Sequence, residues 1–159
     1  EATALNLANH FLTLDALRRE DEIFLPLWEE EYVLCVPRGH PLAGRARIEL
    51  AELQHHDFIE CPPCEAHQQT IGLLACDRLT LNLVAKAESK GLVMALVLAG
   101  VGISFLPDGL VEDEPGLRTV AVNGPRMFRR IGLCYPAHQT LNPALRDLIP
   151  ELASRGASW

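Results

Sequence analysis

The chain has 159 residues, of which 48% are hydrophobic, and a formal net charge of −7. This length suits one ordinary domain or two small lobes. The excess of 21 Asp and Glu over 14 Lys and Arg argues against a basic nucleic-acid-binding stripe. The longest apolar stretch, 92–107, is broken by two glycines and falls short of the ~18–20 residues that span a bilayer, so we expect no membrane association.

The first half of the chain predicts two strands separated by a turn and a short helix. Residues 1–24 fit either a short strand with a turn or a helical turn. Residues 30–37 are rich in strand-forming side chains and stop at a proline. Leu50 and Leu53 share one face of a predicted short helix at 49–56. Residues 57–61 form a short strand that two prolines end.

The middle of the chain alternates between helix and strand. Apolar residues recur at helical spacing in 65–79, and residues 80–88 alternate between apolar and polar. Ser89 and Gly100 stand where the N-cap and the C-terminal glycine of a helix belong, and the helix between them is apolar almost all round. We therefore expect this helix to be buried between layers.

The last third predicts strands at 103–107, 117–122 and 129–136, and a helix at 142–154 that Pro150 kinks or divides. Strands that alternate with helices indicate an α/β fold with a largely parallel sheet. If the strands at 30–36 and 129–135 share a sheet, the residues between them form a second lobe. Two lobes joined by two crossing strands leave a cleft that suits a small molecule.

Five cysteines occur in the chain, which is an odd number, so at least one has no partner within it. Cys35 and Cys134 lie in apolar, strand-like runs and fit buried small hydrophobic residues. This usage is typical of a reducing cytosol rather than of a secreted protein stapled by disulfides. We therefore expect a cytoplasmic location.

Several blocks resemble the LysR-type transcriptional regulators in order and spacing. They are "LPLWEEEYVLCVPRGHPLA", "IELAELQHHDFIEC", "AESKGLVMALVLAGVGISFLP" and "RRIGLCYPAHQTLNPALRDLIPEL". The resemblance covers roughly residues 14–155, and "GVGISFLP" is its most specific part. It implies a periplasmic-binding-protein-like fold of two α/β lobes, with the first lobe incomplete, joined by two crossing strands. The implied division is 1–47 and 126–159 for the first lobe and 48–125 for the second.

The resemblance also implies a function. The regulator would hold a small-molecule effector between its lobes and pass the signal allosterically to a DNA-binding domain. The winged helix-turn-helix and part of the first lobe have no counterpart in this sequence, so we expect a fragment that reaches DNA only through the missing domain. The family pairs through its regulatory domains, which implies a homodimer or tetramer. The alternative function is a solute-binding module that has no role in DNA binding.

The stretch "CPPCEAH", residues 61–67, allows three interpretations. A zinc site would need four ligands, and a second Cys-x-x-Cys is missing. A redox sensor could use Cys64 with Cys76 or with Cys61, because a helix N-terminus lowers a thiol pKa. The third interpretation, which we prefer, is a pocket wall at the carboxyl end of a strand, where open α/β sheets bind ligands.

The resemblance places this loop in the effector cleft, so the candidate effector-binding residues are Pro62, Pro63, Cys64 and Glu65. Glu88 and Ser89 either face the cleft from the opposite side or only cap the following helix. Gly102 joins the candidate set, although "GVG" after a helix favours turn glycines over a dinucleotide loop. A helix N-terminus attracts anions, so organic anions are the first effectors to test.

Catalysis finds no support in the sequence, which contains no G-x-S-x-G elbow, HExxH or Walker loop. We expect no enzyme activity, no cofactor and no bound metal. The basic group formed by Arg126, Arg129 and Arg130 is better explained as a solvated strand end than as a track for phosphates.

Overall fold

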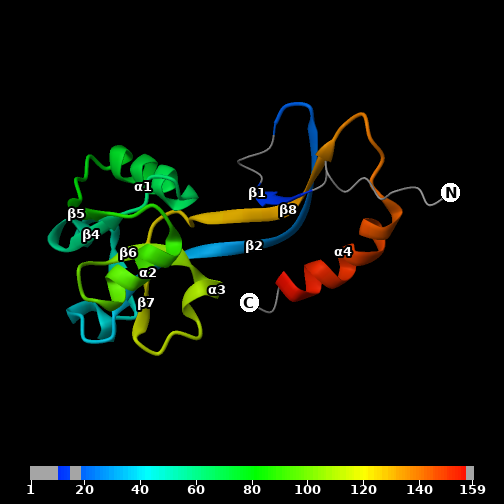
Figure 1. Cartoon of the computed structure of the whole chain (residues 1–159). Helices are drawn as coiled ribbons and strands as arrows, with labels where there is room; N and C mark the ends of the chain where they lie inside the picture. Colours follow the sequence, from blue (N-terminus) through cyan, green and yellow to red (C-terminus); the bar gives the residue numbers. More distant parts are fainter. Residues whose placement is uncertain (1–10, 15–18, 157–159) are drawn as a thin grey trace. The chain divides into compact units, whose positions relative to one another are not determined.

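The computed structural model describes residues 11–14 and 19–156 of the chain, and Figure 1 shows the course of its strands and helices. The strands are β1 (Phe11–Leu14), β2 (Glu22–Pro37), β3 (Arg47–Glu49), β4 (Asp57–Glu60), β5 (Asn82–Lys86), β6 (Ser104–Pro107), β7 (Leu117–Asn123) and β8 (Phe128–Pro136). The helices are α1 (Glu65–Cys76), α2 (Lys90–Leu98), α3 (Asp108–Val111) and α4 (Pro143–Gly156), with 3₁₀ turns at η3 (Pro41–Gly44) and η4 (Leu50–His55).

The chain divides into two compact units, one formed by Glu1–Glu30 with Arg129–Trp159 and the other by Glu31–Phe128. Strand β2 leads from the first unit into the second, and the chain returns at the start of β8. Residues 31–47 belong to the second unit, whereas the sequence assigned them to the first lobe. The reason is that the second half of β2 pairs with β6 and β7 there.

In the first unit, β1 runs antiparallel to β8, which in turn lies next to β2. Strands β8 and β2 approach closely at Gly132 of β8, where an added Cβ would lie 2.4 Å from the carbonyl oxygen of Leu25 in β2. Only glycine fits that space. Helix α4 continues through Pro150, so of the two predicted effects, a kink or a division of the helix, the division is wrong.

In the second unit, β2 pairs antiparallel with β6 and β7, while β7 pairs parallel with β3, and β4 with β5. The largely parallel sheet that we expected is therefore wrong for the strands around β2. The side-chain pattern of a strand identifies the strand but not its direction, which depends on how the chain returns.

The core of the second unit is built from the second half of β2 and the segments that pack on it. The fully buried side chains there include Leu34, Val36, Ile48, Leu53, Ile59, Val93, Val97, Ile103 and Leu106. Helix α2 is buried on one side only, because Leu92 and Leu98 are 45% and 40% exposed. The expectation of a helix buried between layers is therefore wrong for this unit. Within the described segments, no helix is long and apolar enough to cross a bilayer.

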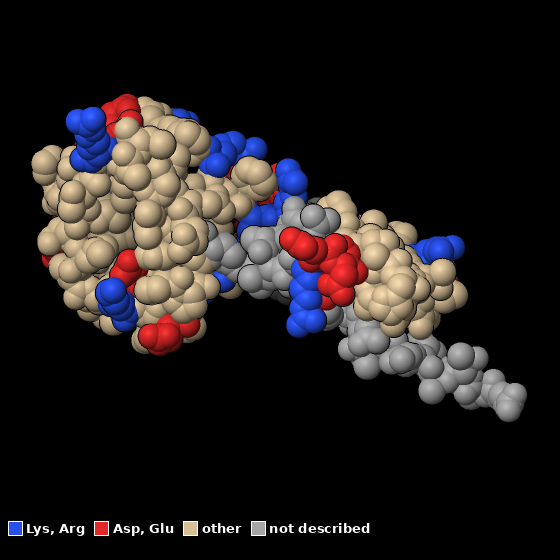
Figure 2. Space-filling model, turned by 90° about the horizontal axis from the view of Figure 1, so that it is seen from above, with Lys and Arg blue, Asp and Glu red and all other residues tan. Residues whose placement is uncertain are grey.

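The three arginines of the basic group pair with three consecutive glutamates of β2. The ion pairs are Arg126–Glu31, Arg129–Glu30 and Arg130–Glu29. On the face shown in Figure 2, the Lys and Arg side chains form small groups separated by uncharged residues, and several lie next to Asp or Glu. Cations paired in this way are poorly suited to bind phosphates. The predicted solvated strand end fits Arg126 and Arg130, whose side chains are 66% and 49% exposed, but not Arg129, whose side chain is 16% exposed.

Candidate functional site

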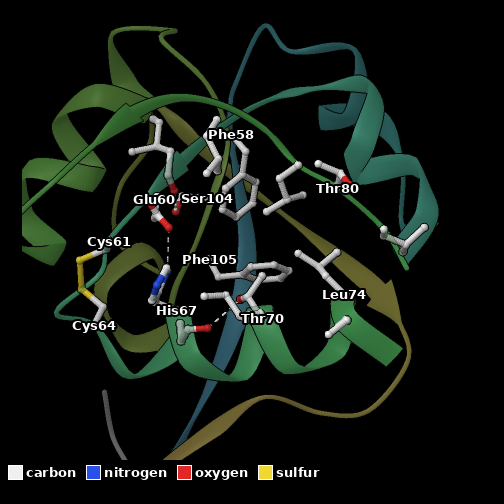
Figure 3. Close-up of a pocket in the computed structure, with 17 residues that line it drawn as sticks. Phe58, Glu60, Cys61, Cys64, His67, Thr70, Leu74, Thr80, Ser104 and Phe105 are labelled. Carbon is white, nitrogen blue, oxygen red and sulfur yellow. Dashed lines mark hydrogen bonds and ion pairs between the residues drawn. A yellow bond between two sulfur atoms is a disulfide. The ribbon is translucent and has the colours of Figure 1, made fainter. Parts of the chain in front are cut away.

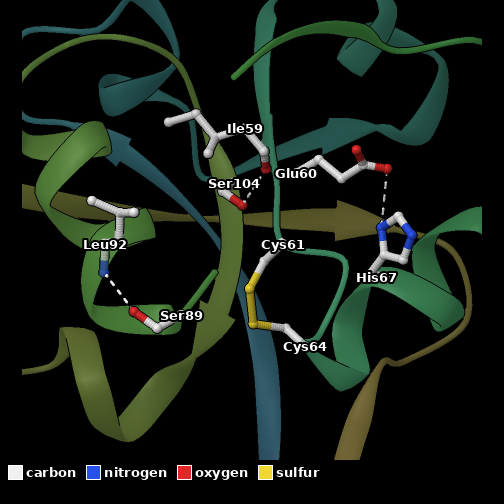
Figure 4. The surroundings of a disulfide bond; sticks show 8 residues. All are labelled: Ile59, Glu60, Cys61, Cys64, His67, Ser89, Leu92 and Ser104. Atoms are coloured by element: carbon white, nitrogen blue, oxygen red, sulfur yellow. Dashed lines mark hydrogen bonds and ion pairs between the residues drawn. A yellow bond between two sulfur atoms is a disulfide. The ribbon is translucent and has the colours of Figure 1, made fainter. Parts of the chain in front are cut away.

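The carboxyl ends of β4 and β5 form the edge on which the candidate loop lies. The two strands are parallel, with Glu60 opposite Lys86, and the Ala87 N–H donates to the Glu60 carbonyl oxygen at 2.8 Å. The segment that follows β4 and the segment that follows β5 therefore meet at one edge. Figure 4 shows the cysteines of the first segment and Ser89 of the second in this region.

The loop after β4 is closed by a disulfide between Cys61 and Cys64, whose Cα atoms lie 5.3 Å apart. The Cys64 N–H donates to the Cys61 carbonyl oxygen at 2.8 Å, so the four residues form a tight turn. Both cysteines are buried and pack in the same core cluster as Ala87. Pro62 and Pro63 are exposed. The loop therefore turns its sulfur atoms inward and its prolines outward.

The segment after β5 begins α2 with a side-chain cap. Ser89 is the N-cap residue, and its Oγ accepts a hydrogen bond from the Leu92 N–H at 3.3 Å. Glu88 is exposed. The sequence left open whether these residues cap the helix or contact an effector. The structure assigns the capping function to Ser89, and a ligand contact by either residue stays a prediction.

Two candidate residues do not join this group. Gly102 lies at the amino end of β4, where an added Cβ would be 2.7 Å from the Asp57 carbonyl oxygen. Cys76 is exposed at the end of α1. Cys76 lies twelve positions after Cys64 along the helix, which corresponds to about 18 Å. A Cys64–Cys76 pair is therefore not assembled, whereas Cys61–Cys64 is. The Glu65 side chain lies outside the described part of the structure.

Among the described residues, no group of three His, Cys, Asp or Glu side chains is arranged to hold a metal ion. The two local cysteines are bonded to each other. The histidine of the stretch, His67, instead faces Glu60, with 3.4 Å between Nδ1 and Oε1.

A cavity of about 350 Å³, hereafter the α1 pocket, lies between α1 and the strands of the second unit. Figure 3 shows α1 along one side, the disulfide at one end and Leu74 and Thr80 toward the other. Its walls are mainly apolar, and they are formed by Phe58, Ile59, Glu60, Cys61, Cys64, Ala66, His67, Thr70, Ile71, Leu74, Ala75, Leu79, Thr80, Leu81, Leu83, Ser104 and Phe105.

Among the described side chains that line this pocket, Glu60 is the acidic one. Its side chain and that of His67 are each 13% exposed. Lys86 Nζ lies 3.1 Å from Glu60 Oε2, but the lysine side chain is 70% exposed. Sequence reasoning missed both the pocket and the Glu60–His67 pair. The sequence held only one signal for the pocket, which was the three-residue spacing of His67 and Thr70. That spacing places both side chains on one face of α1, behind the end of β4.

The family model of the LysR substrate binding domain matches residues 8–157, so the chain belongs to this family. The predicted fold class, a periplasmic-binding-protein-like α/β fold, is therefore confirmed.

An uncharacterized HTH-type transcriptional regulator YybE of Bacillus subtilis is 31% identical over 132 residues, which cover 82% of this chain and 45% of the relative. A probable hydrogen peroxide-inducible genes activator of Mycobacterium avium is 28% identical over 140 residues, covering 82% of this chain and 44% of that protein. The chain thus spans about half the length of these curated relatives. The CcmR regulatory domain of Synechocystis, solved in complex with 2-PG, superposes with a TM-score of 0.79 at 18% identity, over 93% of this chain and 73% of that one.

The disulfide predicts how many cysteine thiols can be alkylated. The chain has five cysteines, of which Cys35, Cys76 and Cys134 are free, so iodoacetamide should label three thiols in unfolded protein without reductant and five after reduction. In native protein at pH 8, Cys76 should react first. Cys35 should not react, because burial raises the pKa of its thiol to about 12 and keeps it protonated.

Intact mass after alkylation measures both counts. As a control, Cys76→Ser should lower each count by one, whereas Cys61→Ser should make all four remaining thiols available without reductant. Five labelled thiols in the unreduced wild type would show that Cys61 and Cys64 are not bonded.

Proposed function

We propose that this chain is the effector-sensing part of a LysR-type transcriptional regulator and acts without catalysis. A small molecule binds at the loop after β4, and the signal passes to a DNA-binding domain elsewhere in the full-length protein. The regulator works in the cytoplasm as a homodimer or tetramer formed through its regulatory domains. Family membership over residues 8–157 supports this function.

The observation that carries the proposal is the meeting of two loops at the carboxyl edge of β4 and β5. Such an edge is where open α/β sheets bind ligands. The proposed contacts are Pro62, Pro63, Cys64 and Glu65 from one loop and Glu88 and Ser89 from the other. The prolines and the disulfide restrict the first loop, so little conformational entropy is lost when a ligand binds.

The free N–H groups at the start of α1 favour an anionic group on this effector. An effector changes the output only through different affinities for two arrangements of the regulator.

A thermal-shift panel of small organic acids tests effector binding on the whole chain. A ligand at about 100 times its Kd adds about 2.7 kcal/mol of stability, which raises the unfolding midpoint of a domain this size by about 5–10 °C. Pro62→Gly combined with Pro63→Gly should reduce that shift, because the loop must then be ordered on binding. A double variant with an unchanged shift would place the ligand elsewhere, and a folded chain that no acid stabilises would contradict the proposal.

The Cys61–Cys64 disulfide favours a second candidate, a thiol redox sensor on the same fold. With a peroxide as oxidant, the Cys64 thiolate attacks one oxygen, the O–O bond breaks, and Cys64 becomes a sulfenic acid. The Cys61 thiol then displaces the sulfenic oxygen and closes the S–S bond. The two sulfurs lose two electrons, and the peroxide leaves as two waters when it is hydrogen peroxide.

Reduction followed by dilute peroxide tests this candidate. If the chain is a redox sensor, peroxide should remove two free thiols together within minutes, and both should map to residues 61 and 64. Cys64→Ser should abolish this loss of thiols. Cys76→Ser is the matched control and should leave the reaction unchanged. If the reduced Cys61 and Cys64 do not react with peroxide, the disulfide is a structural crosslink of the loop.

A further inference from the structure

We propose that the α1 pocket is a second ligand site, contained in the second unit, for a small apolar molecule that carries one ammonium group. This site adjoins the proposed effector contacts on the loop, because Cys64 belongs to both, but its other walls come from α1, β4 and the strands behind them. It would hold a cation, whereas the loop favours an anion. The inference rests on the size of the pocket, on the direction of its hydrogen-bonding groups and on one buried carboxylate oxygen.

The pocket has the size and the walls of a ligand site. Its volume of about 350 Å³ lies in the range of about 300–1,000 Å³ that is usual for small-molecule sites. An apolar cavity of about 150 Å³ already holds benzene. Phe58, Leu74 and Phe105 are each at most 7% exposed and form apolar walls. A two-ring aromatic molecule therefore fits the pocket in both volume and polarity.

Two of the hydroxyl groups that line the pocket, those of Thr70 and Ser104, are set to accept hydrogen bonds rather than to donate them. Thr70 Oγ1 donates to the Ala66 carbonyl oxygen at 2.7 Å, and Ser104 Oγ donates to the Ile59 carbonyl oxygen at 2.8 Å. Both hydroxyl protons are thus committed to the backbone, and only lone pairs remain. If His67 carries its proton on Nδ1, as the contact with Glu60 favours, its Nε2 is also an acceptor.

Glu60 supplies the charge that selects the ligand. Its Oε2 is the buried side-chain oxygen that accepts no hydrogen bond within the described part of the structure. Lys86 Nζ lies 3.1 Å away as an ion pair, yet its side chain is 70% exposed, so water screens this contact. A buried acceptor without a hydrogen bond is costly. A ligand ammonium inside the pocket would supply the missing bond, while a carboxylate there would be repelled.

Three indole compounds of similar size separate the charge types: tryptamine is a cation, tryptophol is neutral and indole-3-acetate is an anion. Each is titrated into the whole chain carrying ¹³C-labelled Ile and Leu methyl groups. We expect tryptamine to shift the methyl signals of Ile59, Leu74 and Leu81. It should also bind about tenfold more tightly than tryptophol, because one added hydrogen bond to a charged group changes the dissociation constant by about that factor. Indole-3-acetate should not shift these signals.

Two variants test the assignment. Glu60→Gln keeps the side-chain size and should weaken tryptamine binding to the level of tryptophol. Ile71→Trp places a larger side chain in the pocket wall and should abolish both. Its control is Leu92→Trp on α2, since Leu92 is 45% exposed against 48% for Ile71 and lies outside the pocket. This control should bind like the wild type.

The proposal is overturned if the three compounds shift the same methyl signals with equal affinity. It is also overturned if none shifts them or if Glu60→Gln binds tryptamine as the wild type does. None of these results depends on the organic-acid panel, so the pocket can fail while effector sensing at the loop stands, and the reverse also holds.

Discussion

Replacing Gly102 with alanine should lower the free energy of unfolding by about 2–3 kcal/mol. The added Cβ would lie 2.7 Å from the Asp57 carbonyl oxygen, which is backbone and cannot swing away. That oxygen also accepts a hydrogen bond from the Ile103 N–H at 2.8 Å, so moving it disturbs the contact between β4 and the segment that leads into β6. Urea unfolding followed by circular dichroism measures the change.

Gly72→Ala is the matched control for this substitution. Gly72 lies inside α1, and an added Cβ there would meet nothing within 4 Å. Alanine is the better helix former, so this variant should gain about 1 kcal/mol. If Gly102→Ala instead kept full stability, the tight contact between Gly102 and the start of β4 would be wrong.

Replacing Arg129 with methionine should cost about 3 kcal/mol in the free energy of unfolding. The Arg129 and Glu30 side chains are only 16% and 13% exposed, and Arg129 Nε donates to Glu30 Oε2 at 2.6 Å. Methionine keeps the apolar length but leaves a largely buried carboxylate without its cation.

Arg130→Met provides the control on the same strand. Its ion pair with Glu29 spans 3.3 Å, and both side chains are 49% exposed, so the loss should stay below about 0.5 kcal/mol. Thermal and urea unfolding of the two variants give the comparison. Equal losses would mean that burial does not distinguish the two pairs.

The sequence predicted the elements of the second unit well, because their signals are local. The strand at 57–61, the helix at 65–79 and the strand at 103–107 correspond to β4, α1 and β6. The cap at Ser89 was visible because N-cap chemistry depends on neighbouring residues only. The short helix at 49–56 is a 3₁₀ turn, η4, whose capping box joins Glu49 and Glu52.

Other features depend on residues far apart in the chain and could not be derived from local patterns. The antiparallel direction of β6 and β7 beside β2 depends on how the chain returns after long excursions. Strand β2 begins at Glu22 rather than near residue 30, because its first half lies next to β8. The α1 pocket likewise requires α1, β4 and β6 to be placed together before it exists.

The candidate site was predictable in part. The sequence marked residues 61–67 and offered metal, redox and pocket-wall interpretations. The structure bonds the two cysteines to each other and places both in the wall of the α1 pocket, while a redox role and a role in the effector cleft stay predictions. Spacing alone could not choose between Cys61 and Cys76 as partners of Cys64. The length of α1 decides this, because it separates Cys64 from Cys76.

Sensing of a small molecule by a LysR-type regulator is the central claim. Its most direct test is a DNase I footprint of the full-length regulator on the DNA upstream of its own gene, with and without the organic acid that most stabilises this chain. We predict that the ligand changes the length or position of the protected segment, because it alters the spacing of the DNA-binding domains. Identical protection with and without a saturating ligand would contradict the account.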